Sequence, residues 1–244
     1  MSKKKQNTAA NTLRDIEETG DRVAEWVAEN AVLILSTIAA ILVLSAGTGL
    51  YLQHGTDTQD EAADALALAS SQYRLAMGAD PAGGPIVEPA NPELAAETRQ
   101  RFADRFVAVA RDHSGTPAAA IALLEAGNLQ AELGDTELAA TTFAAARDAG
   151  ADRAVGALAS TRLARLAEAR GAWAAAAELY EEAGSVESYP LAAESLVEAA
   201  RCWVEAGEAD RALAVYQRLE AEHPDAIVAP QVEALIAELR LTTR

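Results

Sequence analysis

The residue types that most often carry out catalysis or bind metals are few in this sequence, and they lie far apart. Cys202 is the only cysteine, so the chain can form neither an internal disulfide nor a cysteine-based zinc site. The three histidines, at positions 54, 113 and 223, match no metal-binding spacing. The sequence contains no nucleophile elbow, phosphate-binding loop or dinucleotide-binding glycine motif. We therefore expect no enzyme activity, no metal and no cofactor.

Three small groups of residues could take part in catalysis, but each also has a simpler structural explanation. Glu181 and Glu182 could exchange protons, but neighbouring charges in a helical sequence usually form a solvated surface. His113 beside Ser114 fits the end of a helix better than a nucleophile and its base. Cys202 lies in a largely apolar stretch, which favours a small buried residue over a reactive thiol.

Binding chemistry is better supported at Arg162 and Arg165. The chain has 37 acidic against 20 basic residues and a net charge of −17, so basic residues are scarce. A guanidinium binds carboxylates through paired hydrogen bonds, so these two arginines could hold a peptide carboxylate or an acidic partner. The alternative is surface pairing with nearby glutamates, which contributes less than ~1 kcal/mol. The acidic balance argues against nucleic acid as a partner, and we expect no small-molecule substrate.

The elements that position these arginines follow from a repeat. Three glycines in alanine-rich sequence, separated by 37 and 36 residues, each end one helical stretch and begin a short turn: Gly134, Gly171 and Gly207. Equivalent positions around them are small or aromatic in every copy except at the last position of the third, which is a leucine. They are Gly127, Ala164 and Ala200 before the turn, then Ala139, Ala176 and Ala212, then Phe143, Tyr180 and Tyr216, then Ala146, Ala183 and Leu219.

These positions predict stacked helical hairpins. Small residues allow two antiparallel helices to approach closely, and a ring fills the gap toward the next hairpin. A glycine at the turn can adopt the left-handed conformation that ends many helices. The pattern resembles the tetratricopeptide repeat (TPR), a helix–turn–helix unit of roughly 34 residues. The resemblance is strongest in EAGNLQAELGDTELAATTFAAA, and only the third copy has the closing proline, Pro224.

Stacks of this kind usually present a concave surface lined by the first helix of each hairpin. Here those helices are expected over about 118–133, 155–170 and 190–206. The candidate protein-binding residues on them are Asn128, Gln130, Glu132, Arg162, Arg165, Glu198 and Arg201.

An uncharged apolar run occupies residues 31–52, AVLILSTIAAILVLSAGTGLYL. As a helix it would span roughly 33 Å, enough for the ~30 Å hydrocarbon core of a membrane. Positive residues flank it unequally: Lys3, Lys4, Lys5, Arg14 and Arg22 precede it, and the first to follow is Arg74. The positive-inside rule then places the N-terminus in the cytoplasm and the rest of the chain across the membrane.

Two alternatives concern this N-terminal region. Small residues up to Gly47 would permit cleavage as a signal peptide, but a preceding stretch of about 30 residues with six acids is unlike a signal peptide. An uncleaved anchor is therefore favoured. Residues 12–30 could form an amphipathic helix at the inner membrane surface or simply a frayed cytoplasmic tail.

The predicted organisation is all-α. It comprises a cytoplasmic tail (1–30), a transmembrane helix (31–52), a helical pair joined by a mobile Gly/Pro-rich loop (53–116), three TPR-like repeats (117–224) and a C-terminal capping helix (225–244). Asn91 and Pro92 should begin the second helix of the pair, and Thr116 and Pro117 the first repeat. The repeats should form an α-solenoid.

The order of anchor, HSGTP and repeats resembles the YfgM-type single-pass TPR proteins, described as ancillary subunits of the Sec translocon. The segments YRLAM, RFADRFVAVARDHSGTPAAAIALLEAGNLQAELGD and TRLARLAEARGAWAAAAELYE carry this resemblance. It implies a bacterial inner-membrane protein with a periplasmic TPR domain. The implied partners are translocon subunits and periplasmic chaperones that handle exported proteins. The alternative is a scaffold for cell-envelope assembly or cell division.

Overall fold

The computed structural model describes residues 57–80, 86, 89, 91–226, 228 and 230–242. Every regular element in these residues is an α-helix, which confirms the all-α class for this part of the chain. None of the described helices is long and apolar enough to cross a membrane. The predicted tail and anchor, 1–30 and 31–52, lie outside the described residues, as does most of the Gly/Pro-rich loop. The anchor and the division into domains remain predictions.

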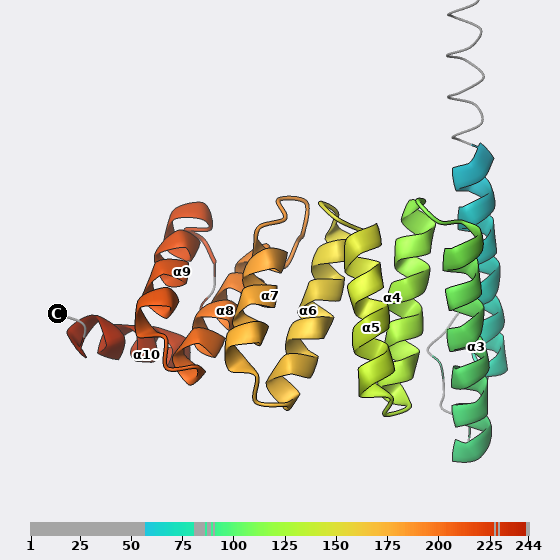
Figure 1. The fold of residues 1–244 in the computed structure, drawn as a ribbon, viewed down its shortest axis with the longest axis horizontal. Helices are drawn as coiled ribbons and strands as arrows, with labels where there is room; N and C mark the ends of the chain where they lie inside the picture. Colours follow the sequence, from blue (N-terminus) through green and yellow to red (C-terminus); the bar gives the residue numbers. More distant parts are fainter. Residues whose placement is uncertain are drawn as a thin grey trace, which may run out of the picture. The chain divides into compact units, whose positions relative to one another are not determined.

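Consecutive helices of the compact unit Thr58–Arg244 pack against each other, and up to α9 they run as antiparallel neighbours, whereas α10 lies across the end of the stack (Figure 1). An unlabelled helix over 57–76 is followed by α3 (Pro92–Asp112), α4 (Pro117–Glu132), α5 (Thr136–Ala149), α6 (Ala154–Ala169), α7 (Trp173–Gly184), α8 (Ala192–Glu205), α9 (Ala209–Glu222) and α10 (Pro230–Thr242). The three predicted hairpins are therefore α4–α5, α6–α7 and α8–α9. The tetratricopeptide-like solenoid is confirmed.

The turn inside each hairpin is a glycine C-cap. The backbone φ angle is 87° at Gly134, 71° at Gly171 and 79° at Gly207, all in the left-handed region. At the first turn, the backbone N–H of Asp135 donates to the carbonyl of Gln130 at 2.9 Å, and that of Gly134 to Ala131 at 3.0 Å. The other two turns repeat both hydrogen bonds. This is a Schellman motif, and a residue with a side chain would be strained at the glycine.

Small residues lie where the helices of a hairpin come closest. Ala139, Ala176 and Ala212 are fully buried at equivalent positions of α5, α7 and α9. A Cβ added at Gly127 would lie 2.6 Å from two ring atoms of Phe143, so glycine is required there by the ring of the facing helix. The same ring reaches a cluster containing Ala159 of α6. It therefore packs within its own hairpin as well as against the next one.

Local capping signals are used as the sequence predicts. The Asn91 side chain accepts hydrogen bonds from the backbone N–H groups of Glu93 and Leu94, at 3.0 and 3.3 Å, and begins α3. Thr116 accepts from the backbone of Ala119 at 3.2 Å and begins α4. These bonds satisfy donors that a helix N-terminus would leave unpaired.

The spacing between repeats is longer than in a regular TPR partly because of the segment between α7 and α8. Its Tyr189 is only 6% exposed and packs with Ala157 of α6 and Ala192 of α8. The extra residues thus bring a tyrosine back against the preceding hairpin. At the other end, Val232 and Ile236 of α10 join the cluster of the third hairpin, as a capping helix should.

Candidate functional site

The first helices of the hairpins line a groove of about 590 Å³, called here the arginine groove. Its walls come from the 57–76 helix, α4, α5 and α6. The residues that line it include Tyr73, Glu125, Asn128, Leu129, Glu132, Phe143, Arg162, Arg165 and Leu166. The groove therefore combines an apolar floor with amide, carboxylate and guanidinium groups, the composition expected of a site for a polar peptide segment.

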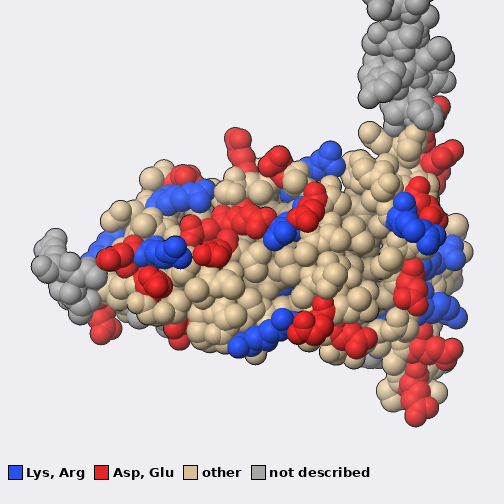
Figure 2. Space-filling model, viewed as in Figure 1, with Lys and Arg blue, Asp and Glu red and all other residues tan. Residues whose placement is uncertain are grey.

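Two arginines of α6 stand in this groove without a carboxylate at ion-pair distance. Among the described residues, neither Arg162 nor Arg165 makes a hydrogen bond or an ion pair within 4 Å. The Nε atom of Arg162 is buried and has no hydrogen-bond acceptor. Other arginines are paired, for example Arg99 with Glu132 at 2.8 Å. On the face shown in Figure 2, acidic and basic side chains lie side by side rather than in one large patch.

Glu125 is the acidic residue most affected by the groove. Burial raises the pKa of its carboxyl group, while a hydrogen bond from Asn128 and the charge of Arg162 oppose that change. A raised pKa means that the folded state binds this proton more tightly than the unfolded state does. Ionised Glu125 therefore costs stability at neutral pH, and it costs nothing once both states are protonated.

We predict that Glu125→Gln slightly raises the melting temperature at pH 7, because it removes the cost of burying a charge. The gain should shrink as the pH falls and vanish below about pH 4, where the unfolded chain is also protonated. Thermal unfolding followed by circular dichroism across this range measures both effects. Glu97→Gln on the exposed side of α3 is the matched control. A gain from Glu125→Gln that does not depend on pH would contradict this account.

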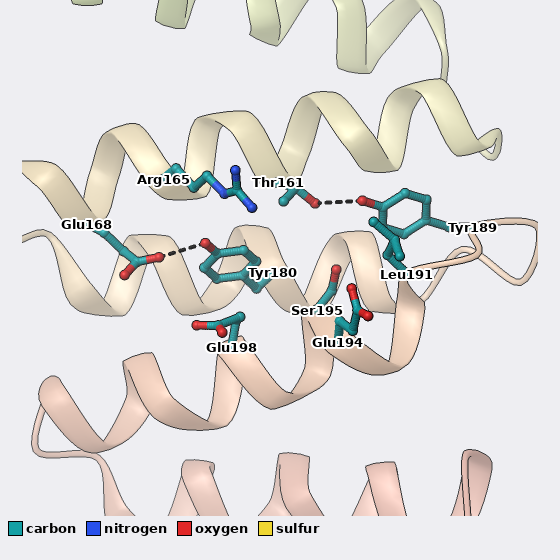
Figure 3. A pocket seen from close by; sticks show the side chains of 9 residues that line it. All are labelled: Thr161, Arg165, Glu168, Tyr180, Tyr189, Leu191, Glu194, Ser195 and Glu198. Carbon is teal, nitrogen blue, oxygen red and sulfur yellow. Dashed lines mark hydrogen bonds between the residues drawn. The ribbon is translucent and has the colours of Figure 1, made fainter. Parts of the chain in front are cut away.

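A second space, called here the tyrosine pocket, adjoins the groove and measures about 370 Å³. It lies between α6 and α8, with α7 behind it (Figure 3). The residues that line it are Thr161, Arg165, Glu168, Tyr180, Tyr189, Leu191, Glu194, Ser195 and Glu198. Arg165 lines both spaces, so the groove and the pocket meet at this residue of α6.

Hydrogen bonds hold the two tyrosines of the pocket. The hydroxyl of Tyr180 donates to Glu168 at 2.6 Å, and burial together with this carboxylate raises the pKa of the tyrosine (Figure 3). The Tyr189 and Thr161 hydroxyls lie 3.4 Å apart. Thr161 already donates to the carbonyl of Ala157 at 3.0 Å, so it is the acceptor for Tyr189. The rings are thereby fixed in place before any ligand arrives.

Arg201, which lies on α8, pairs with two of the carboxylates that line the pocket. It donates to Glu198 at 2.7 Å and also pairs with Glu168 of α6. This network joins the second and third hairpins. It is only partly buried, so we regard its main effect as fixing the carboxylates rather than as a large gain in stability.

The structure brings five of the seven predicted binding residues to these two spaces: Asn128, Glu132, Arg162, Arg165 and Glu198. The prediction that Gln130 is exposed is wrong. Its side chain is 3% exposed, and its Oε1 has no hydrogen-bond partner among the described residues. Arg201 lines neither space, since it is half-buried and paired with Glu168 and Glu198. A binding role for these residues remains a prediction.

Sequence reasoning missed most of the tyrosine pocket. The pocket residues it did not single out are Thr161, Glu168, Tyr180 as a pocket residue, Tyr189, Leu191, Glu194 and Ser195. It also did not single out Glu125 of the arginine groove. One signal was available: positions 161, 165 and 168 of α6, and positions 194, 195 and 198 of α8 with residue 191 just before it, each follow the period of one helix face. The sequence of either helix alone does not show that these two faces meet across two hairpins.

The groupings with a possible catalytic use have structural roles. Cys202 is fully buried, and burial raises the pKa of its thiol to about 12, so the nucleophilic thiolate is scarce near neutral pH. Glu181 accepts a hydrogen bond from the indole of Trp203 at 2.5 Å, and Glu182 accepts one from Ser160 at 3.2 Å. Within the described residues no cluster of His, Cys, Asp or Glu could hold a metal ion.

Stacked helical hairpins with a lined groove define a repeat protein of the interaction-module class, which is typically non-catalytic. The chain belongs to the tetratricopeptide repeat-like domain family, whose sequence model matches residues 24–218. A comparison with curated proteins finds no match.

Two solved structures of TPR-like repeats are similar to this chain. Both are of nearly identical repeats from Podosopora anserina, proposed to be a kinesin light chain, and one of the two carries a single substitution. Each is 16% identical to this chain with a TM-score of 0.44. They cover 60% of this chain, and the matches span 80% and 79% of their own lengths.

Proposed function

We propose that this chain is a membrane-anchored interaction module whose TPR-like domain works in the bacterial periplasm, beside the Sec translocon and the chaperones that receive exported proteins. The arginine groove is the observation that carries the interaction role. It offers two guanidinium groups that have no carboxylate within 4 Å, side by side on one helix of an otherwise acidic chain. A carboxylate of a partner protein would gain two charge-assisted contacts there without first breaking an ion pair.

The anchoring part of the proposal is supported by the apolar run 31–52 and by the lysines at one end of the sequence. The family match begins at residue 24, so the run and the repeats fall within one matched region. The translocon and chaperone partners come from the resemblance to YfgM-type proteins. A groove that accepts segments of other proteins fits a position where unfolded chains emerge from a channel.

Photo-crosslinking in native membranes tests this proposal. A benzoylphenylalanine in place of Asn128 would sit in the arginine groove, and one in place of the exposed Gln217 of α9 serves as the control. We expect position 128 to capture translocon subunits, periplasmic chaperones or newly exported chains, and position 217 not to. Capture of division or envelope-assembly proteins alone would replace the translocon role with that of a general scaffold. Equal capture at both positions would contradict a role for the groove.

A further inference from the structure

The tyrosine pocket has an excess of negative charge although it adjoins two arginines. Three carboxylates line it, from Glu168, Glu194 and Glu198, against the single guanidinium of Arg165. Arg201, behind the wall, pairs with Glu168 and Glu198. Glu194 has no ion pair or hydrogen bond among the described residues. The pocket therefore keeps a net negative charge after its own pairs are counted.

One hydroxyl that lines this pocket also has no hydrogen-bond partner in the described residues. Ser195 is 3% exposed, and its Oγ makes no hydrogen bond with any described residue. Figure 3 shows the hydroxyl oxygen pointing into the space between α6 and α8. A ligand group in the pocket that donates a hydrogen bond would satisfy it.

The walls suit a positive group on a flexible stem. The rings of Tyr180 and Tyr189 line the space with Leu191, so an aliphatic stem would find apolar contacts. A lysine or arginine side chain buries its methylene groups in this way while its charged end meets polar groups. The tyrosine rings can add cation–π attraction. An anion in the same space would face three carboxylates.

We propose that the tyrosine pocket binds the lysine or arginine side chain of a protein segment whose carboxylate is held by Arg162 and Arg165. This inference rests on the proposed function of the arginine groove. Because Arg165 lines both spaces, one extended segment can reach both. The site then selects segments in which an acidic group and a basic side chain lie a short distance apart, and an acidic segment without the basic side chain binds less tightly.

Fluorescence anisotropy with labelled glycine-serine peptides of equal length tests this on the purified full-length chain. The peptides carry a glutamate alone, an arginine alone, both, or both in the reverse order. We expect both peptides that carry the two charges to bind about tenfold more tightly than the one with glutamate alone. Both orders are tested because a flexible peptide can place its two charges in the groove and the pocket from either direction.

Two variants separate the pocket from the groove. Glu194→Gln and Ser195→Ala should each reduce the gain from the basic side chain to about twofold or less, while binding of the glutamate peptide stays unchanged. Glu205→Gln removes an equal charge from α8 outside the pocket and should leave the gain intact.

The outcomes distinguish failure of the inference from failure of the proposed function. If the glutamate peptide binds but arginine adds nothing, or if the gain survives in Glu194→Gln, the pocket inference is wrong and the groove proposal stands. If no peptide binds, both are wrong. If only arginine-containing peptides bind and Glu194→Gln removes that binding, the pocket is supported and the groove proposal fails.

Discussion

Replacing Phe143 by alanine is expected to lower the free energy of unfolding by about 3–5 kcal/mol, the usual cost of removing a buried ring. The ring is 2% exposed and packs between Gly127 of its own hairpin and Ala159 of the next. Its loss would open a cavity where the first two hairpins meet. Urea unfolding followed by circular dichroism measures the change. Leu138→Ala, at a 48% exposed position of the same helix, should alter the free energy by no more than about 0.5 kcal/mol.

The effect of a second substitution, Gly127→Ala, should reverse sign in the Phe143→Ala protein. In the natural protein the new Cβ would lie 2.6 Å from two ring atoms of Phe143, so the ring must move and stability falls. In the Phe143→Ala protein the methyl group enters vacated space. The exchange of glycine for alanine inside α4 then contributes about 1 kcal/mol of helix stability.

A double-mutant cycle measures this coupling. The double variant should be more stable than Phe143→Ala alone, whereas Gly127→Ala alone is less stable than the natural protein. Additive effects would show that Gly127 and Phe143 do not contact each other, and the packing of the first hairpin would then be wrong.

The turns and caps could be predicted because they depend on local chemistry. A left-handed backbone angle strongly favours glycine, so Gly134, Gly171 and Gly207 mark their turns without reference to the rest of the fold. Asn91 and Thr116 begin their helices for a similarly local reason. The positions of the small residues followed from the repeat, because stacking places equivalent residues in equivalent surroundings.

Gln130 shows why a polar residue type does not always indicate an exposed position. α4 packs against α3, α5 and α6, so almost its whole circumference is covered. A polar residue on such a helix can be buried although its type predicts exposure. Helix periodicity gives a single buried face only when a helix has neighbours on one side.

The tyrosine pocket could not be predicted for a different reason. It needs Tyr189, which comes from the longer segment between α7 and α8 and not from a repeat position. Whether Tyr189 lies beside Thr161 depends on how the second and third hairpins stack. Arg162 and Arg165 were identifiable because basic residues are scarce, but the absence of carboxylate partners among the described residues is a fact of tertiary structure.

Reversing the charge of both groove arginines should have the largest effect on binding. Each guanidinium–carboxylate contact contributes about 1.5–3 kcal/mol when made. The variant Arg162→Glu/Arg165→Glu replaces two attractions by two repulsions. We expect its affinity for the glutamate peptide to fall at least about 100-fold in fluorescence anisotropy. Arg153→Glu is the control, because it reverses the charge of an exposed arginine just before α6 that lines neither space.

Loss of binding could also follow from misfolding, since Arg162 is half-buried. A swap of peptide charge separates these causes. A folded Arg162→Glu/Arg165→Glu protein presents carboxylates where the natural protein presents guanidinium groups, so it should bind a peptide with arginine in place of glutamate more tightly than the natural protein does. Both interactions should also weaken as ionic strength rises, because exposed charges are screened. If the variant remains helical and melts cooperatively yet binds the glutamate peptide as tightly as the natural protein does, the two arginines do not form the binding site.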